Sequence, residues 1–325
     1  MTNEKTDRLV AMARGWLCGF VSLVLGLVAR GETRTPFPTW HAPRAVTQGP
    51  HEHLLASYFA IDSWSPDKRY MLVLETDLNG RLPEAGERCT IGVVDLADGN
   101  RFIPVSTTAC WNFQEAAMGH WVDNDTILFN DVREGRFRTV VMDWRTKREI
   151  RVLPHPVSAV SEDRTWAVSV NYARLSLLRP DYGYAGPGQD PRETEPWPTD
   201  DGLWTMDLRT GASKLILSVA DTRSQMPQPT RVAGKPGQPL AYHCHTAISK
   251  DGAKIFFLAR SVDWFDKVTH KVPYWRTTSF TVNRDGTGLV AASRTIGKAR
   301  TSTGRRTARI GCSSRRHAAT TTTRR

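Results

Sequence analysis

Residues 64–75 read WSPDKRYMLVLE, in which a Ser-Pro-Asp turn is followed at once by an apolar run that ends in an acid. Residues 91–99 read IGVVDLADG, a second apolar run that ends in a turn rich in Asp and Gly. Ser and Asp favour turns because their side chains hydrogen-bond their own backbone, and Gly accepts the positive φ of tight hairpins. The two stretches therefore predict strands at 70–75 and 91–95, with a turn before the first and after the second.

Both turn types recur along the chain. The first recurs at 161–163 (SED) and 249–251 (SKD), with a degenerate copy at 122–125 (VDND), and the second recurs at 143–146, 207–211 and 283–286. The runs between them are rich in Val, Ile, Phe, Trp and Thr and lack a helical period, which indicates β-strands. The predicted strands are 70–75, 91–95, 126–130, 139–143, 166–171, 203–207, 254–259 and 277–282.

Strand-rich units repeated in this way are typical of a β-propeller, in which each blade buries its faces against its neighbours. One copy of each turn type defines one four-stranded blade, so the all-β body contains four blades. The spacing is uneven because of two insertions rich in Pro and Gly, 180–202 and 221–240. We expect them to form loops over one mouth of the central channel, where ligands usually bind.

Several stretches resemble a known family. The turn WSPDKRY (64–70) and its partner VDLADG (94–99) resemble the repeat of TolB-type propellers. The stretches GPHEH (49–53), WNFQE (111–115), GHW (119–121) and RPDYGY (179–184) resemble more particularly the bacterial branch related to oligogalacturonate lyases. The resemblance covers residues 48–290. It implies a seven-bladed propeller, a divalent metal, commonly Mn²⁺, held at its centre by His and Gln, and a carbon–oxygen lyase that cleaves uronate oligosaccharides by β-elimination.

The chain departs from that family pattern after Val290. Only four blades can be counted, and residues 291–325 contain no aromatic residue, no acid and no alternation, so we expect a disordered basic tail. One interpretation is a basic arm that binds nucleic acid or an acidic surface. The other, which we favour, is a truncated or frame-shifted end, because Arg, Thr, Ala, Gly and Ser dominate out-of-frame translation of GC-rich genes and the tail begins where another blade should begin.

The charge is concentrated in this tail. The chain carries a formal net charge of +11, and residues 294–325 contribute +10 of it through nine arginines and one lysine with no acid. Residues 1–14 contribute one more, so residues 15–293 are neutral overall. A neutral body does not produce the basic field that attracts nucleic acid, so we do not expect nucleic acid as a partner.

Residues 16–29 read WLCGFVSLVLGLVA, an apolar run that follows Lys5, Arg8 and Arg14. This layout predicts that residues 1–30 are a secretory signal peptide, since the run is shorter than the roughly 20 residues that span a bilayer. An uncleaved membrane anchor and a buried helix of the folded domain are the alternatives. We therefore expect the protein to be exported or anchored to a membrane.

Familiar signatures of catalysis are absent from the sequence. There is no G-x-x-x-x-G-K-[ST], no G-x-S-x-G and no H-E-x-x-H. The five cysteines include no Cys-x-x-Cys pair, which excludes the common zinc and thiol-redox motifs. A disulfide between two of Cys89, Cys110 and Cys244 remains open if the chain is exported.

His243 and His245 are the sharpest candidates for chemistry. In an extended strand they would point to the same side, as two ligands of one metal ion require. The resemblance places His245 where the lyase-related proteins carry a histidine before a blade turn, which implies His245 as a Mn²⁺ ligand. The alternative is an exposed or hydrogen-bonded pair without metal. The family's remaining ligands would lie in blades that this chain lacks.

A further set of polar and aromatic residues suits a saccharide. Segment 111–121 mixes aromatic platforms with amide and carboxylate groups, although propellers also pack Trp between blades. The histidines near the start of blade one either line the channel mouth or are ordinary loop residues. Elimination at a uronate needs a cation against the carboxylate and a base for the C5 proton. The substrate-binding candidates are His51, His53, Trp111, Gln114, His120, Asn171 and Tyr182, and the catalytic candidates are Arg174, Arg179 and His243.

Two functions of different class follow. The first is a lyase-like enzyme that acts on acidic oligosaccharides, impaired in this chain because the blade set is incomplete. The second is a non-catalytic TolB-like module that binds a protein or a glycan.

Overall fold

The computed structural model describes residues 42, 44–58, 61–186, 190–227, 239–265 and 274–298. All elements named below belong to one compact unit that begins at Val46. The predicted export segment 1–30 and residues 299–325 of the predicted tail lie outside the described residues. In the described part of the chain, no helix is both long enough and apolar enough to cross a bilayer.

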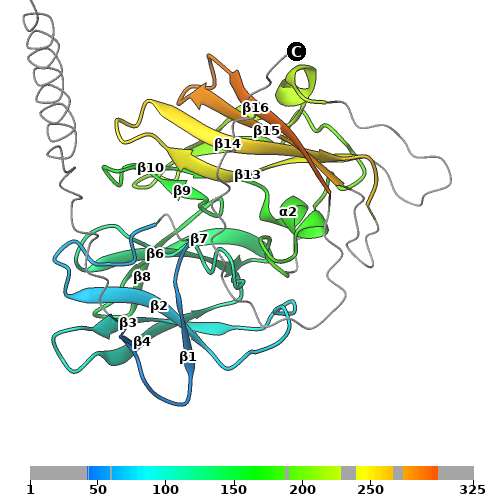
Figure 1. Ribbon diagram of the computed structural model, residues 1–325. Coiled ribbons are helices and arrows are strands. Elements are labelled where there is room, and N and C mark those ends of the chain that lie inside the picture. Colours follow the sequence, from blue (N-terminus) through cyan, green and yellow to red (C-terminus); the bar gives the residue numbers. More distant parts are fainter. Residues whose placement is uncertain are drawn as a thin grey trace, which may run out of the picture. The chain divides into compact units, whose positions relative to one another are not determined.

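Four antiparallel sheets, each of four strands, follow one another along the chain as the blades of a β-propeller (Figure 1). The strands of each sheet are hydrogen-bonded in chain order, so every blade is a simple meander. Blade 1 contains β1 (Glu52–Leu55), β2 (Tyr70–Thr76), β3 (Cys89–Asp95) and β4 (Arg101–Thr108). Blade 2 contains β5 (His120–Trp121), β6 (Thr126–Arg133), β7 (Arg136–Asp143) and β8 (Arg148–Leu153). Blade 3 contains β9 (Ala159–Val160), β10 (Trp166–Ser169), β11 (Gly202–Asp207) and β12 (Ser213–Ser218), and blade 4 contains β13 (Leu240–Ile248), β14 (Lys254–Val262), β15 (Tyr274–Asn283) and β16 (Val290–Lys298).

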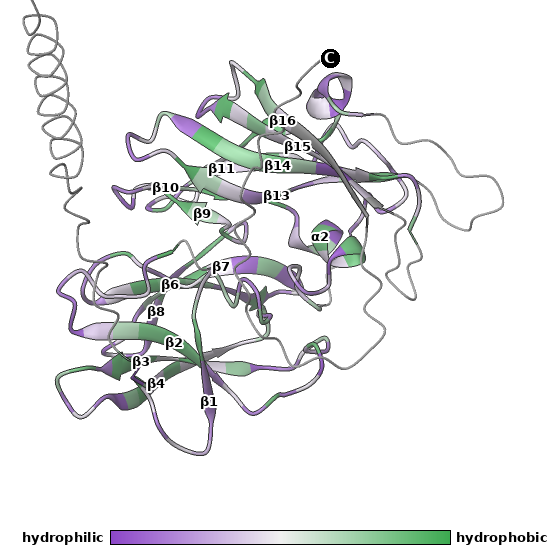
Figure 2. Ribbon diagram, in the orientation of Figure 1, coloured by the Kyte–Doolittle hydropathy of each residue, from purple (hydrophilic) through white to green (hydrophobic). Residues whose placement is uncertain are grey.

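The eight predicted strands are confirmed as the two middle strands of each blade. Strands β2, β3, β6 and β10 are buried along most of their length, so their apolar runs are nearly continuous and easy to recognise. In β14 and β15 buried residues alternate with more exposed ones. Hydrophobic colours run along much of β2 and β14, whereas the turns are hydrophilic (Figure 2). The first strands of the blades carry a weaker signal because they are short, as in β5 (HW) and β9 (AV).

The two turn types have the chemistry that the sequence predicts. In blade 3, Ser161 Oγ donates to Asp163 Oδ1 (2.6 Å) and accepts the N–H of Trp166 (3.1 Å). The second turn of the same blade is closed by Asp207 Oδ1, which accepts from the N–H groups of Arg209 (3.0 Å) and Thr210 (2.7 Å). Equivalent bonds occur at Ser65, Ser249, Asp95 and Asp143.

A helix that the sequence analysis missed follows β10. The strand predicted at 166–171 ends at Ser169, and α2 (Tyr172–Leu178) begins after Asn171, whose side chain accepts the N–H of Arg174 (2.9 Å). Short apolar runs do not distinguish a strand from a buried helix, and the Asn cap was the available signal. A 3₁₀ turn, η1 (Ala220–Gln225), follows β12.

The described parts of both insertions lie at the same end of the blades, as predicted. Strands alternate in direction, so connections after even-numbered strands emerge at one end. Asn112 Nδ2, after β4, donates to the carbonyls of Tyr182 (3.0 Å) and Gly183 (3.2 Å), after β10. Thr222, after β12, lies 3.4 Å from His243 Nε2 through its hydroxyl. We call this end the loop end and the opposite end the turn end.

Blade 4 extends into the segment that was expected to be disordered. Strand β16 pairs with β15 from Thr281↔Val290 to Tyr274↔Lys298, so the predicted end of the propeller at residue 290 was wrong by one strand. An outer edge strand needs main-chain hydrogen bonds on one side only. The segment Ala291–Ala292–Ser293 can therefore form part of this strand without alternating apolar and polar residues. Ser293 Oγ lies 2.7 Å from Ser279 Oγ across the pair.

Candidate functional site

Tyr58 lies where the innermost strand of blade 1 is interrupted. Strand β1 pairs with β2 as far as Leu55↔Val73, and the ladder resumes where Leu72 N–H donates to the carbonyl of Ser63 (2.8 Å). The chain leaves the ladder between these points. The ring of Tyr58 lies 6.4 Å from that of Tyr182 and 5.8 Å from that of His245. Blade 1 therefore meets blades 3 and 4 at this point.

His245 occupies a comparable interruption in β13. The register with β14 shifts between Cys244 and Ala247, and the φ of His245 is +53°. Bulges of this kind re-aim a side chain and are common beside functional sites. The imidazole packs 4.9 Å from the Tyr182 ring and meets Tyr58 edge-on.

Two guanidinium groups lie close to this histidine. Arg179 follows α2, stacks over the Tyr182 ring at 4.2 Å and bonds Asp181 through two nitrogens (2.8 and 2.6 Å). Arg260 lies on β14, opposite Tyr242 of β13. Both cations act on the imidazole of His245.

Glu115 adds a buried carboxyl from the connection that precedes blade 2. It accepts the hydroxyl of Tyr172 on α2 (3.1 Å), and it is the acid whose charge acts on Tyr58. The four blades thus converge on one set of polar side chains, which we call the central cluster. It consists of Tyr58, Glu115, Arg179, Tyr182, His245 and Arg260.

Five groups of the central cluster have shifted pKa values; those of Arg179 and Arg260 are raised, and burial sets the direction for the other three. Burial lowers the pKa of His245 to about 4, and the charges of Arg260 and Arg179 lower it further in the same direction. Burial raises the pKa of Glu115 to about 7 and that of Tyr58 to about 12. At neutral pH the imidazole is therefore neutral and the Tyr58 phenol is protonated. Shifted groups that gather at one place are typical of functional sites.

Two nitrogens of the central cluster have no hydrogen-bond partner within the part of the chain that the structure describes. The Nδ1 of His245 and the Nε of Arg260 are both buried from solvent and unbonded. A buried polar atom without a partner costs about 1–3 kcal/mol, so folded proteins rarely leave one unpaired. A ligand that bonds these atoms would remove this cost.

His243 and His245 do not act as one pair. His243 packs 4.8 Å from Phe257, beside Thr222, whereas His245 packs against Tyr58 and Tyr182. The two imidazoles have no contact in common, because the bulge ends the strand alternation on which the prediction depended. Burial lowers the pKa of His243 to about 3, with Arg174 adding to the shift.

The residues around His245 do not fit a divalent metal. No group of three or more His, Cys, Asp or Glu side chains able to hold an ion occurs among the described residues. The nearest charges to His245 include two guanidiniums, which repel a metal cation. The donor set therefore disagrees with the Mn²⁺ that the family resemblance implies.

Arg174 and Asn171 have structural contacts at the base of the loop end. Arg174 is fully buried, and its guanidinium donates to Asp190 (2.8 Å) and to the carbonyls of Ala241 (2.6 Å) and Glu195 (2.7 Å). Asn171 caps α2 and donates to Asp190 and Asp201. These contacts hold the insertion against blade 4 and leave no donor of Arg174 directed at a ligand.

Two other predicted substrate-binding residues lie apart from the central cluster. His120 is buried in β5, where Nδ1 bonds the carbonyl of Met118 (2.8 Å) and burial lowers its pKa to about 4. Gln114 is exposed in the connection before β5, and its main-chain N–H donates to Asn112 Oδ1 (2.9 Å).

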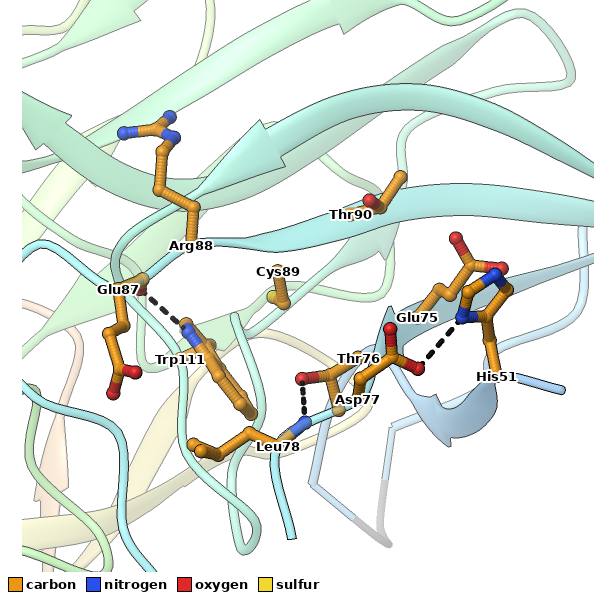
Figure 3. A pocket seen from close by; sticks show the side chains of 10 residues that line it. All are labelled: His51, Glu75, Thr76, Asp77, Leu78, Glu87, Arg88, Cys89, Thr90 and Trp111. Carbon is orange, nitrogen blue, oxygen red and sulfur yellow. Dashed lines mark hydrogen bonds and ion pairs between the residues drawn. The ribbon is translucent and has the colours of Figure 1, made fainter.

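His51 and Trp111 meet in a pocket of about 440 Å³ at the loop end of blade 1 (Figure 3). His51 Nδ1 lies 2.7 Å from Asp77 Oδ1, a contact that raises the pKa of the imidazole. The indole Nε1 of Trp111 donates to the carbonyl of Glu87 (2.9 Å). His53 lies beside the pocket, 3.3 Å from Glu75 Oε2. His51, Glu87 and Arg88 of this pocket have partners from the chain, whereas His245 Nδ1 of the central cluster has none among the described residues.

Sequence reasoning did not identify Arg260 as a site residue. Arg260 lies within strand β14, and an arginine in a strand is normally predicted to face the solvent. Arg260 is recognised as a site residue only from its place in the sheet, because it pairs across the strands with Tyr242, close to the bulge in β13. The pairing register needed to see this is not available from the sequence.

No protein-family model matches the chain, and no curated protein sequence matches it. Among solved structures it is similar to a protein assigned as TolB from Agrobacterium tumefaciens, with 14% identity over 78% of this chain and 85% of that one and a TM-score of 0.31. It is also similar to the periplasmic gluconolactonase PpgL of Pseudomonas aeruginosa (11% identity, 74% and 88% covered, TM-score 0.25). A puromycin hydrolase matches with 13% identity, 71% and 28% covered, and a TM-score of 0.38. Scores this low carry no argument about fold or function, and the propeller assignment rests on the strand pairing.

Proposed function

We propose that the central cluster binds an acidic saccharide and promotes β-elimination at a uronate residue. One observation carries the proposal. A neutral imidazole, with a buried nitrogen that has no partner among the described residues, packs against two tyrosine rings and is acted on by two guanidiniums. A neutral imidazole accepts a proton, and guanidinium groups bind carboxylates.

The reaction would proceed as follows. The substrate carboxylate binds against Arg260 and Arg179, which stabilise the negative charge that develops when the C5 proton leaves. His245 Nδ1 takes that proton, and the electron pair of the C–H bond forms the C4–C5 double bond. The C4–O bond breaks with its electrons on oxygen, which takes the proton of the Tyr58 hydroxyl. The proton on His245 then returns to Tyr58 through solvent, which restores both groups.

The two tyrosine rings would hold the sugar. Tyr58 and Tyr182 stand at 62° to each other, with centroids 6.4 Å apart, around the imidazole. Aromatic rings offer flat apolar faces with a polar edge, which suits the faces of sugar rings. No step uses a metal, in keeping with the donor set around His245.

Non-catalytic binding of a glycan or protein is the second candidate. The bidentate bond between Arg179 and Asp181 favours it, because a guanidinium already paired must exchange its partner to bind a substrate carboxylate. In that case the cluster would bind an acidic ligand without transforming it.

The experiment uses the purified chain and oligogalacturonate. Elimination is followed by the ultraviolet absorbance of the unsaturated uronide, and binding is followed separately by calorimetry. We expect His245→Gln to lower the elimination rate at least tenfold with binding largely kept, and Arg260→Gln to weaken binding. His51→Gln, outside the cluster, is the matched control and should change neither. Binding without product would leave the second candidate, and the absence of binding would exclude both the elimination and the binding of this acidic glycan.

A further inference from the structure

The seams between neighbouring blades carry a repeated side-chain pair at the turn end. The first residue of each second strand meets the residue that follows the closing Asp or Asn of the next blade. Between blades 1 and 2 these are Tyr70 and Trp144, whose rings are 4.7 Å apart. Between blades 3 and 4 they are Trp166 and Arg284, with the guanidinium 4.5 Å from the indole. Each pair fills the seam with a large planar group from both sides.

The seam between blades 2 and 3 lacks this pair. The equivalent residues are Thr126 and Leu208, as the matching main-chain bonds of Trp144 to Asp125 and of Leu208 to Thr165 show. A groove of about 480 Å³ takes the place of the missing rings. It reaches inward to Val122 beside β5 and outward to Ile150 on β8.

The groove is apolar along its length and cationic at its rim. Its apolar lining consists of Val122, Leu128, Val141, Ile150 and Leu208. Arg164 and Arg209 line it as well, and neither guanidinium forms a hydrogen bond or ion pair with the described residues. The acids in the lining, Asp123 and Asp207, each already accept two main-chain N–H groups of their own turns.

The turns at the rim have few main-chain groups left to pair with an extended peptide. The N–H groups of Arg164, Thr165, Leu208 and Arg209 all donate within the chain. The carbonyls of Leu208 and Arg209 accept from Arg151 Nη1. A peptide in the groove would leave its own polar backbone unpaired, which is costly, whereas an acyl chain has no such groups.

We propose that this groove binds a single-chain amphipathic carboxylate of the fatty-acid class, with its acyl chain along the apolar lining and its carboxylate at Arg164 and Arg209. The site lies at the turn end and is independent of the function proposed for the central cluster. The groove volume suits a chain of medium length, and the unpaired guanidiniums supply the complementary charge.

The test is calorimetric titration of the purified chain with dodecanoate. We expect saturable binding that Leu208→Trp abolishes by filling the groove, and that the double variant Arg164→Gln, Arg209→Gln weakens at least tenfold. Arg148→Gln, an exposed arginine of β8 outside the lining, is the matched control and should leave binding unchanged. Far-ultraviolet circular dichroism of each variant confirms that the fold is kept.

Two further titrations separate the parts of the site. Dodecanol should bind the parent chain and the double arginine variant equally, because it lacks the charge that the arginines recognise. A short acidic peptide should not compete with dodecanoate. The proposal is wrong if dodecanoate does not saturate, if it binds the Leu208→Trp variant unchanged, or if the peptide displaces it.

Discussion

Arg174 Nη1 lies 2.8 Å from Asp190 Oδ2, in an ion pair whose side chains are 1% and 0% exposed. Replacing Arg174 by Met would leave the Asp190 carboxylate buried without its cation. Removing one partner of a buried pair costs about 3–5 kcal/mol, and we expect a loss of that size in the free energy of unfolding, measured with urea. Arg192→Met breaks the exposed pair with Asp200 and should cost less than about 1 kcal/mol. Equal losses would show that burial of the pair does not matter.

The charge of Arg260 should contribute to the low pKa of His245. Burial is the main cause of the shift, and the guanidiniums of Arg260 and Arg179 add to it, so Arg260→Gln should raise the pKa of His245 part of the way from about 4 toward the ordinary value of 6.5. Proton NMR titration of the ring resonances, assigned with His245→Gln, measures the shift. The pKa of His243, on which Arg260 does not act, should stay near 3 and serves as the internal control.

Glu115 should make the protein less stable as the pH rises. Its pKa is about 7 when folded and about 4.5 when unfolded, so the folded state binds more protons between these values. The stabilisation is complete below pH 4.5 and is lost as the pH passes 7, a change of about 3 kcal/mol. Glu115→Gln removes this dependence.

The buried histidines make the protein less stable as the pH falls, which is the opposite of the effect of Glu115. The pKa values of His120, His243 and His245 are lowered by burial, so their contribution is lost as the pH falls from 6.5 toward 4. The informative quantity is therefore the difference in unfolding free energy between the parent chain and Glu115→Gln, measured from pH 5 to pH 8. A difference that does not change with pH would contradict the raised pKa of Glu115.

The serine turns offer a matched pair of substitutions. Ser161→Ala removes the acceptor of the buried N–H of Trp166 and should cost about 1–3 kcal/mol in urea unfolding. Ser249 has the same bonds, to Asp251 and to the N–H of Lys254, but near solvent, where water replaces the lost acceptor. Ser249→Ala should therefore cost less. A larger loss of stability for Ser249→Ala than for Ser161→Ala would mean that burial of the serine hydrogen bond does not determine its contribution to stability.

Removal of divalent metal should not change the action of the central cluster. The cations that act on His245 are the guanidiniums of Arg260 and Arg179, and the proposed proton transfers use only side chains of this chain. Oligogalacturonate elimination should proceed at the same rate after dialysis against a chelator and after addition of Mn²⁺. A rate that depends on added Mn²⁺ would contradict the mechanism.

The sequence predicted those parts of the fold that depend on local chemistry. Ser161 and Asp207 close their turns with bonds that span a few residues, and the middle strands are recognisable because their runs of apolar and β-branched residues are long and bounded by these turns. Strand β16 escaped prediction because an edge strand is specified by its partner's backbone, and α2 escaped because its apolar run also reads as a strand.

The candidate site was predictable only in part. Arg179, Tyr182 and His245 stand in stretches whose residue types suggested chemistry. Arg260 and Tyr58 join them through a strand register and a break in β1, neither of which is encoded by a local pattern. The same bulge that brings His245 to Tyr182 separates it from His243, so one unpredicted irregularity both assembles the central cluster and removes the predicted metal pair.

Each blade consists of consecutive strands, and among the described residues no strand is exchanged between sheets. Most ladders can therefore close over a short loop, at low entropic cost, as soon as their own residues have left the ribosome, whereas the pairing of β10 with β11 must wait for the long segment that contains α2. The contacts that join distant parts of the chain, such as the bond from Arg174 to the carbonyl of Ala241, can form only after the last blade exists. During synthesis we therefore expect the blades to form in chain order, and the central cluster, which takes side chains from blades 1, 3 and 4, to assemble only after blade 4.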